Sequence, residues 1–145
     1  MNTTSAATAS AVTFVWLGMV LGISFLEAPL KFRAPGVTIP IGLGIGRMVF
    51  RALNLVEAAL AVVVIVAVAV GGAPVPVIAL TAAVAVLLLV QLLFVRPRLN
   101  RRSDRVLSGA EPVDGPRSHD HLVYVALEIV KVGVLIALGI ALLTV

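Results

Sequence analysis

The sequence contains no cysteine, few charged residues and few aromatic residues. Without cysteine, disulfides, thiolate metal sites and thiol redox chemistry are excluded. Only 12% of the 145 residues are charged and 61% are hydrophobic, whereas soluble globular domains contain about 25% charged residues. Between Glu57 and Arg96 no side chain is charged, and this run is long enough for two membrane crossings of about 20 residues each. The composition therefore predicts an integral membrane protein.

The net charge of +4 comes from basic residues that lie beside the apolar runs rather than within them. Ten of the eleven lysines and arginines lie within or next to the connections 31–46 and 96–118, and Lys131 is the exception. This distribution is typical of topology determinants in membrane proteins. No nucleic-acid partner is predicted. By the positive-inside rule both connections are cytoplasmic, and both termini lie on the non-cytoplasmic side.

Four apolar segments predict four membrane-spanning helices, at approximately residues 9–30, 47–70, 77–95 and 119–143. Short connections make consecutive helices antiparallel neighbours, so we expect an all-α, up-down-up-down four-helix bundle that forms a single domain over residues 1–145. The cytoplasmic connection 31–46 is rich in glycine and proline, which are poor helix formers. It is interpreted as a flexible connector, a re-entrant or interfacial segment, or a loose first turn that begins near Pro40.

Several polar side chains interrupt the apolar segments. In the fourth segment, His121, Tyr124, Glu128 and Lys131 fall within an arc of about 80° at 100° per residue. Charges are costly at bilayer depth, so such side chains are expected to face the protein interior and to find partners there. The predicted intramembrane cluster draws on the first, second and fourth segments and consists of Glu27, Arg51, Asn54, Glu57, Tyr124, Glu128 and Lys131. Gln91 either joins this layer or lies at the interface.

The charges of this predicted cluster do not balance. Three carboxylates face two cations, Lys131 and Arg51. The remaining carboxylate should therefore hold a proton or meet a cation. This imbalance favours a transporter-like or ligand- or cation-binding protein. The alternative is a structural or accessory membrane subunit whose buried charges only specify helix packing, which is a known use of buried polar groups.

A second alternative is a metal-binding membrane oxidoreductase. Carboxylates and histidine suit manganese, iron or zinc, and His121, Glu57 and Glu128 are the weak ligand candidates. The sequence has no Glu-x-x-His motif of the kind found in di-metal bundles. His119 and His121 would point about 200° apart on one helix, so at most one of them faces the interior. No cofactor and no catalytic residue are predicted, and an enzyme is the less favoured interpretation.

Two further features concern the surface. The arginines that flank the apolar segments are candidates for contact with lipid headgroups or other anions, and near anionic lipids each contributes about 1 kcal/mol; they are Arg47, Arg96, Arg98, Arg101 and Arg102. Gly18 and Gly22 form a GxxxG pair, which allows close approach of helices in lipid. This face could mediate a homodimer, the glycines could pack against a neighbouring helix of the same chain, or they could simply be part of an apolar helix without a specific contact.

Residues 18–50 include the run Ser24-Phe-Leu-Glu-Ala-Pro-Leu-Lys-Phe-Arg-Ala-Pro-Gly36. This stretch resembles a run found in small bacterial proteins that are catalogued as uncharacterised membrane proteins, and the similarity extends over most of the chain. The resemblance implies four helices and a location in the bacterial inner membrane. It implies no activity.

Overall fold

The computed structural model describes residues 1–109 and 119–145, and the described residues form four helical rods without any strand. In the first and third rods the helix type changes along the way, but the chain does not reverse direction. The first rod contains α1 (Thr3–Val20), the π-helix η1 (Leu21–Glu27), α2 (Ala28–Leu30) and the 3₁₀-helix η2 (Lys31–Arg33). The others are α3 (Ile39–Gly71), then α4 (Val75–Val90) with the π-helix η3 (Gln91–Val95) and α5 (Arg96–Leu107), and finally α6 (His119–Leu143).

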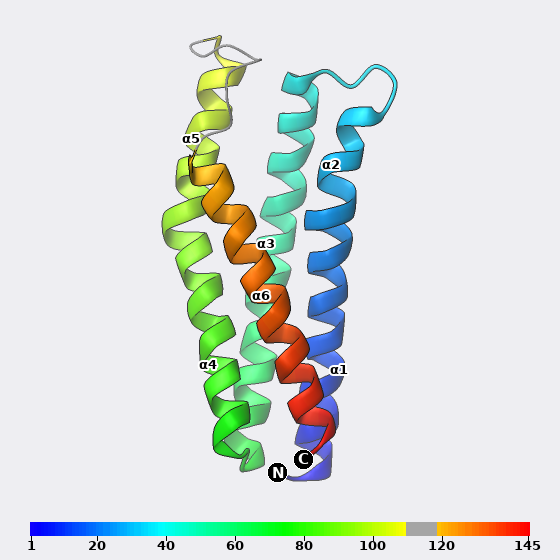
Figure 1. Cartoon of the computed structure of the whole chain (residues 1–145), viewed down its shortest axis with the longest axis vertical. Helices are drawn as coiled ribbons and strands as arrows, with labels where there is room; N and C mark the ends of the chain where they lie inside the picture. The colour runs from blue at the N-terminus through cyan, green and yellow to red at the C-terminus, as the bar shows by residue number, and fades with distance from the viewer. Residues whose placement is uncertain (110–118) are drawn as a thin grey trace.

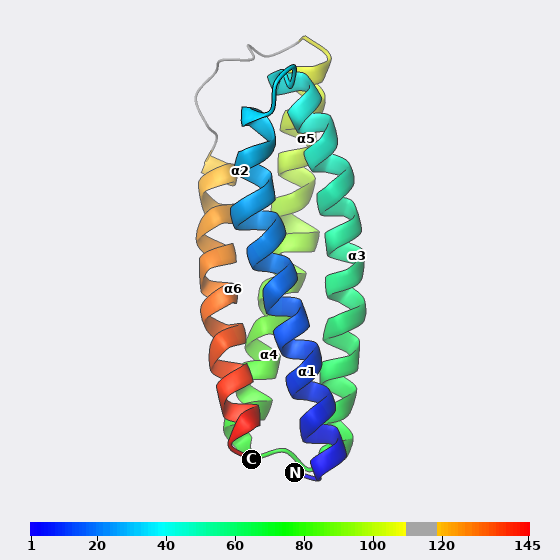
Figure 2. The same ribbon diagram turned by 90° about the vertical axis from the view of Figure 1, so that its right-hand side faces the viewer.

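Each of the four rods is long and apolar enough to cross a membrane, judged over the described residues. The predicted all-helical class with four candidate spans is confirmed. Helix α1 packs against α3 and α6, and α6 also packs against α4. Both termini lie at the same end of the bundle (Figures 1 and 2). The backbone N–H of Asn2 donates to the carbonyl oxygen of Gly71 at 3.0 Å, so the start of α1 is fixed beside the end of α3.

The connection after the first rod is shorter than predicted, because α3 begins at Ile39 rather than near residue 47. Thr38 caps this helix by accepting a hydrogen bond from the Ile41 N–H at 3.4 Å, and Pro40 lies in its first turn. Gly42 and Gly46 lie where η2 packs on α3. A Cβ atom at Gly42 would lie 2.2 Å from the Phe32 ring, and one at Gly46 would lie 2.9 Å from the Lys31 Nζ. The alternative in which the second helix begins near Pro40 is therefore confirmed, and the interpretations of residues 39–46 as a flexible connector or a re-entrant segment were wrong.

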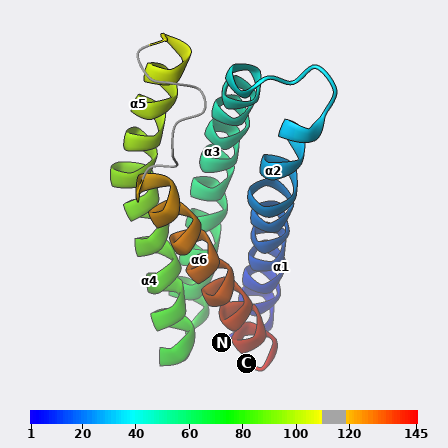
Figure 3. The same ribbon diagram turned by 45° about the horizontal axis from the view of Figure 1, so that its top comes forward.

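The first half of the predicted loop 96–118 is also helical. Helix α5 continues from η3 to Leu107, while residues 110–118 of this predicted loop lie outside the described part of the chain. Arg47 of α3 forms an ion pair with Asp104 of α5. Both helices extend past the level at which α6 begins (Figures 1 and 3). Because 33 helical residues rise about 50 Å and the hydrocarbon core is about 30 Å thick, part of α3 lies outside a bilayer of that thickness.

The first helix likewise begins earlier than predicted, at Thr3 instead of residue 9. The Asn2 side chain caps it by accepting a hydrogen bond from the Ser5 N–H at 2.8 Å. The predicted start of this first helix was late because the polar Thr and Ser residues of its first turn do not add to an apolar pattern.

The buried side chains form two apolar layers along the bundle axis. The larger layer includes Trp16, Val64, Leu88 and Leu135, and the smaller layer consists of Phe50, Leu53, Val95 and Tyr124. On each of three rods, buried polar residues lie between the two layers in the sequence: Glu57 on α3, Gln91 on η3, and Glu128 and Lys131 on α6.

Candidate intramembrane site

The Lys131 ammonium group is the centre of a buried polar network. Its Nζ atom donates to Glu57 Oε1 at 2.7 Å and to Gln91 Oε1 at 2.9 Å, and it lies 2.6 Å from Glu128 Oε1. Three contacts match the three protons of an ammonium group. The side chain of Lys131 is 1% exposed, so water does not replace any of these contacts.

Two further hydrogen bonds connect the surrounding groups. The Trp16 indole Nε1–H donates to Glu57 Oε1 at 2.9 Å, and Gln91 Nε2 donates to Glu128 Oε1 at 2.8 Å. All members are at most 3% exposed. We call this set the Lys131 network; it takes one or two residues from each of the four rods and consists of Trp16, Glu57, Gln91, Glu128 and Lys131.

The Lys131 network contains two carboxylates and one ammonium group. If every group is ionised, it carries one excess negative charge in a site without water contact. Glu128 Oε2 is buried and has no hydrogen-bond partner among the described residues, whereas Glu128 Oε1 has two. A buried carboxylate oxygen without a donor is costly in its ionised form. One proton would make the network neutral.

The structure brings only part of the predicted cluster together. Glu57, Glu128 and Lys131 are in contact, and Tyr124 is buried one turn from Glu128 with its ring edge-on to Phe50. Asn54 is half-buried and lies outside the Lys131 network.

Two other members of the predicted cluster lie elsewhere. Arg51 is exposed, so the prediction that its guanidinium neutralises a buried glutamate was wrong. The long side chain of Arg51, in the fourth turn of α3, reaches the surface instead. Glu27 is half-buried and forms a long ion pair with Lys31 at 3.8 Å. The charge imbalance therefore arises from two carboxylates and one lysine rather than from the predicted set.

Sequence reasoning missed Trp16 and left the position of Gln91 open. Both lie on the buried stripe of their rod. Trp16 continues the buried series Ala9, Thr13 and Val20, and Gln91 continues the series Thr81, Val84 and Leu88. The helical period of these stripes, together with the need of a buried indole N–H for an acceptor, is the signal that could have identified them.

The predicted metal ligands do not converge. Among the residues that the structure describes, no group of three or more histidine and acidic side chains is arranged to hold a metal ion. His121 is half-buried and lies two turns before Glu128 on α6. Oxygens of Glu57 and Glu128 face the Lys131 ammonium instead. The grouping of His121, Glu57 and Glu128 as a metal site was wrong.

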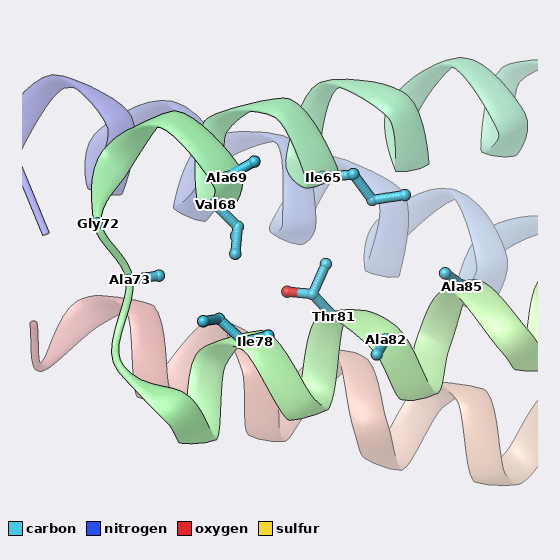
Figure 4. A pocket seen from close by; sticks show the side chains of 9 residues that line it. All are labelled: Ile65, Val68, Ala69, Gly72, Ala73, Ile78, Thr81, Ala82 and Ala85. Atoms are coloured by element: carbon cyan, nitrogen blue, oxygen red, sulfur yellow. The ribbon is translucent and has the colours of Figure 1, made fainter.

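Two grooves lie near the termini and away from the Lys131 network. One, of about 420 Å³, lies between α3 and α4, and its walls are almost entirely apolar (Figure 4). Thr81 points toward this groove, but its hydroxyl already donates to the Val77 carbonyl at 2.8 Å. The other, of about 360 Å³, lies between α1 and α3. Neither groove includes a member of the Lys131 network.

The GxxxG pair faces away from the rest of the chain. A Cβ atom at Gly18 or Gly22 would meet nothing within 4 Å among the described residues, so the alternative in which these glycines pack on a neighbouring helix of the same chain was wrong. The homodimer contact stays a prediction. Of the surface arginines, Arg98 and Arg101 are exposed and Arg102 is half-buried.

Comparisons of the sequence and the structure with protein families, curated proteins and solved structures returned no match. The fold and the site define the class: an all-helical protein with four candidate membrane spans, in which a lysine pairs with two glutamates in the interior.

Proposed function

We propose that this chain is a small transporter-like protein of the bacterial inner membrane in which the Lys131 network holds one exchangeable proton. The observation that carries the proposal is the pairing of one ammonium group with two buried carboxylates. Both termini are assigned to the non-cytoplasmic side because the basic residues gather at the opposite end. Intramembrane ionisable residues of this kind are typical of ion and proton pathways.

Glu128 is the residue that we assign as the proton carrier. Its Oε1 accepts from Lys131 and Gln91, and its Oε2 has no donor among the described residues. Glu57 Oε1 likewise accepts from Trp16 and Lys131, but Glu57 Oε2 is not among the buried oxygens that lack a partner. A proton on Glu128 Oε2 would remove the excess charge without breaking any of these contacts.

A packing role alone does not require the second carboxylate. One glutamate and Lys131 would form a neutral pair, and the further buried charge costs several kilocalories per mole unless it is neutralised. In this structure the network is closed to both grooves. Proton exchange with the arginine-rich end therefore requires the layer of Phe50 and Tyr124 to open transiently, and passage to the other side requires the larger apolar layer to open as well.

The alternative is a structural or accessory membrane protein. It is favoured by a specific observation: the ammonium group has three oxygen contacts, and the network joins all four rods. When each N–H of a buried ammonium group has an oxygen acceptor on a different helix or turn, these contacts determine how otherwise similar apolar helices pack. Under this alternative the proton on Glu128 is permanent and does not exchange.

Proton flux into proteoliposomes separates the two functions. A pH-sensitive dye is enclosed, a potassium diffusion potential is imposed, and acidification is recorded. We expect the wild type to carry protons faster than protein-free liposomes, and Glu128→Gln to reduce the rate to that background. Asp104→Asn is the matched control, because it changes an exposed carboxylate to an amide. A wild-type rate equal to the background, or a Glu128→Gln rate equal to that of the wild type, would favour the structural alternative.

A further inference from the structure

A second charged layer lies toward the arginine-rich end of the bundle, separate from the Lys131 network. The Arg96 guanidinium carbon is 4.5 Å from the ring centroids of both Phe50 and Tyr124. The Lys31 Nζ is 5.8 Å from the Phe50 centroid, so both cations share one aromatic ring. Cations above aromatic rings are favourably placed, but the rings supply no hydrogen-bond acceptors of ordinary strength.

Two of the three guanidinium nitrogens of Arg96 are buried without acceptors, although the residue as a whole is only half-buried. Its Nε and Nη2 atoms are enclosed and have no hydrogen-bond partner among the described residues. These two nitrogens share one edge of the guanidinium plane, and such an edge binds two oxygens of a carboxylate or phosphate side by side. A buried charged donor without an acceptor is expensive, so this edge is built for an acceptor that the described side chains do not provide.

The charges of this layer also point to an anion. Arg96 and Lys31 supply two positive charges, while Glu27 supplies one negative charge through a long contact of 3.8 Å to the Lys31 Nζ. The side chain of Lys31 is only 10% exposed. One positive charge is left over, and the side chain of Glu27, 34% exposed, connects the layer with the surface.

The length of the third rod would place Arg96 at an edge of the hydrocarbon core, next to the lipid headgroups. About 30 Å of helical rise separates Val75, the first residue of α4, from Arg96, and this equals the usual thickness of the hydrocarbon core. We propose that Arg96 and Lys31 form a binding site for a phosphate group, carried either by an acidic lipid headgroup or by free phosphate. The anion displaces the Glu27 carboxylate from Lys31 and places two oxygens on the Nε–Nη2 edge of Arg96.

Thermal unfolding of the reconstituted protein tests this site. The midpoint temperature is measured in vesicles of phosphatidylcholine, in vesicles that also contain phosphatidylglycerol, and in phosphatidylcholine vesicles with inorganic phosphate. A ligand that binds only the folded state raises the midpoint. We expect a rise of a few degrees in the wild type and in Arg101→Gln, which removes an exposed arginine of the same helix, and no rise in Arg96→Gln.

The two probes identify the source of the phosphate. A rise with phosphatidylglycerol alone assigns the site to a lipid headgroup, and an equal rise with inorganic phosphate assigns it to the free anion. The proposal is overturned if neither probe stabilises the wild type, or if Arg96→Gln responds as strongly as Arg101→Gln.

If Arg96→Gln does not fold, two further variants test the proposed phosphate site. Glu27→Gln removes the competing carboxylate and should enlarge the rise, whereas Lys31→Gln should diminish it. Responses equal to that of the wild type in both variants would also overturn the proposal.

Discussion

At the scale of single residues, Lys131 is the centre of the polar contacts in the interior of this bundle. Lys131 contacts two glutamates and a glutamine, and all four side chains are almost completely buried. Removing one partner from a buried ion pair leaves an uncompensated charge, which costs far more than the pair itself contributes. The stability of the network should therefore depend on charge balance more than on the number of its hydrogen bonds.

Lys131→Met is expected to lower the free energy of unfolding by about 3–5 kcal/mol, because the ionised glutamate of the network loses the cation that pairs with it among the described residues. Denaturant titration in detergent micelles measures this loss. The triple variant Lys131→Met, Glu57→Gln, Glu128→Gln carries no charge in the network and should recover most of the stability. If the single variant were as stable as the wild type, the network would not be an ion-pair network in the folded protein.

The sequence predicts the charged residues of the network better than its neutral ones. Glu57, Glu128 and Lys131 are recognisable because a charge within an apolar span must face the interior. Trp16 and Gln91 carry no charge, and either could lie against lipid headgroups or protein. Arg51 was misplaced because its long side chain extends from the helix to the surface, which its angular position alone does not reveal.

At the scale of helices, small residues decide where the rods touch. Gly42 and Gly46 let η2 lie on α3, and Gly71 lets the start of α1 lie on the end of α3. The sequence predicts four spans because their apolar runs are long. It leaves the start of α3 near Pro40 as one alternative among several, because glycine is a poor helix former and the packing that requires it here is not visible in the sequence.

Gly71→Ala and Gly133→Ala form a matched pair that tests this packing. A Cβ atom at Gly71 would lie 2.7 Å from Ser5 Cβ, an atom fixed to the backbone of α1, whereas one at Gly133 would meet nothing within 4 Å among the described residues. We expect Gly71→Ala to destabilise the protein by about 1–3 kcal/mol through overpacking. Gly133→Ala should be neutral or stabilise it by up to about 1 kcal/mol.

Thermal and denaturant unfolding of Gly71→Ala, Gly133→Ala and the wild type measure the change in the free energy of unfolding that each substitution causes. Equal effects of the two substitutions would show that α1 and α3 are not in close contact at Gly71.

At the scale of the whole molecule, the bundle is asymmetric along its axis. The end with the termini carries no charged side chain among the described residues and contains both grooves. The opposite end carries α5, its arginines and the Arg47–Asp104 ion pair. This asymmetry is the basis for orienting the protein with its arginine-rich end in the cytoplasm.

The absence of cysteine makes the orientation directly measurable. Thr144 follows the last residue of α6 and Ser108 follows the last residue of α5, and these helices end at opposite ends of the bundle (Figure 1). Both positions are exposed and can each be changed to a single cysteine. In intact spheroplasts, a membrane-impermeant maleimide should label Thr144→Cys and should label Ser108→Cys only after the membrane is permeabilised. The reverse pattern would place both termini in the cytoplasm and would contradict the proposed orientation.

The central claim is that the Lys131 network holds one proton on a carboxyl group. Infrared spectroscopy of the reconstituted protein at neutral pH detects that proton through the C=O stretch of a carboxylic acid. We predict that the wild type shows this band and that both Glu57→Gln and Glu128→Gln lose it, since the remaining carboxylate then pairs with Lys131 alone. Lys131→Met should strengthen the band, because both glutamates then need a proton. A wild-type spectrum without the band, or a band unchanged in both glutamine variants, would contradict the account.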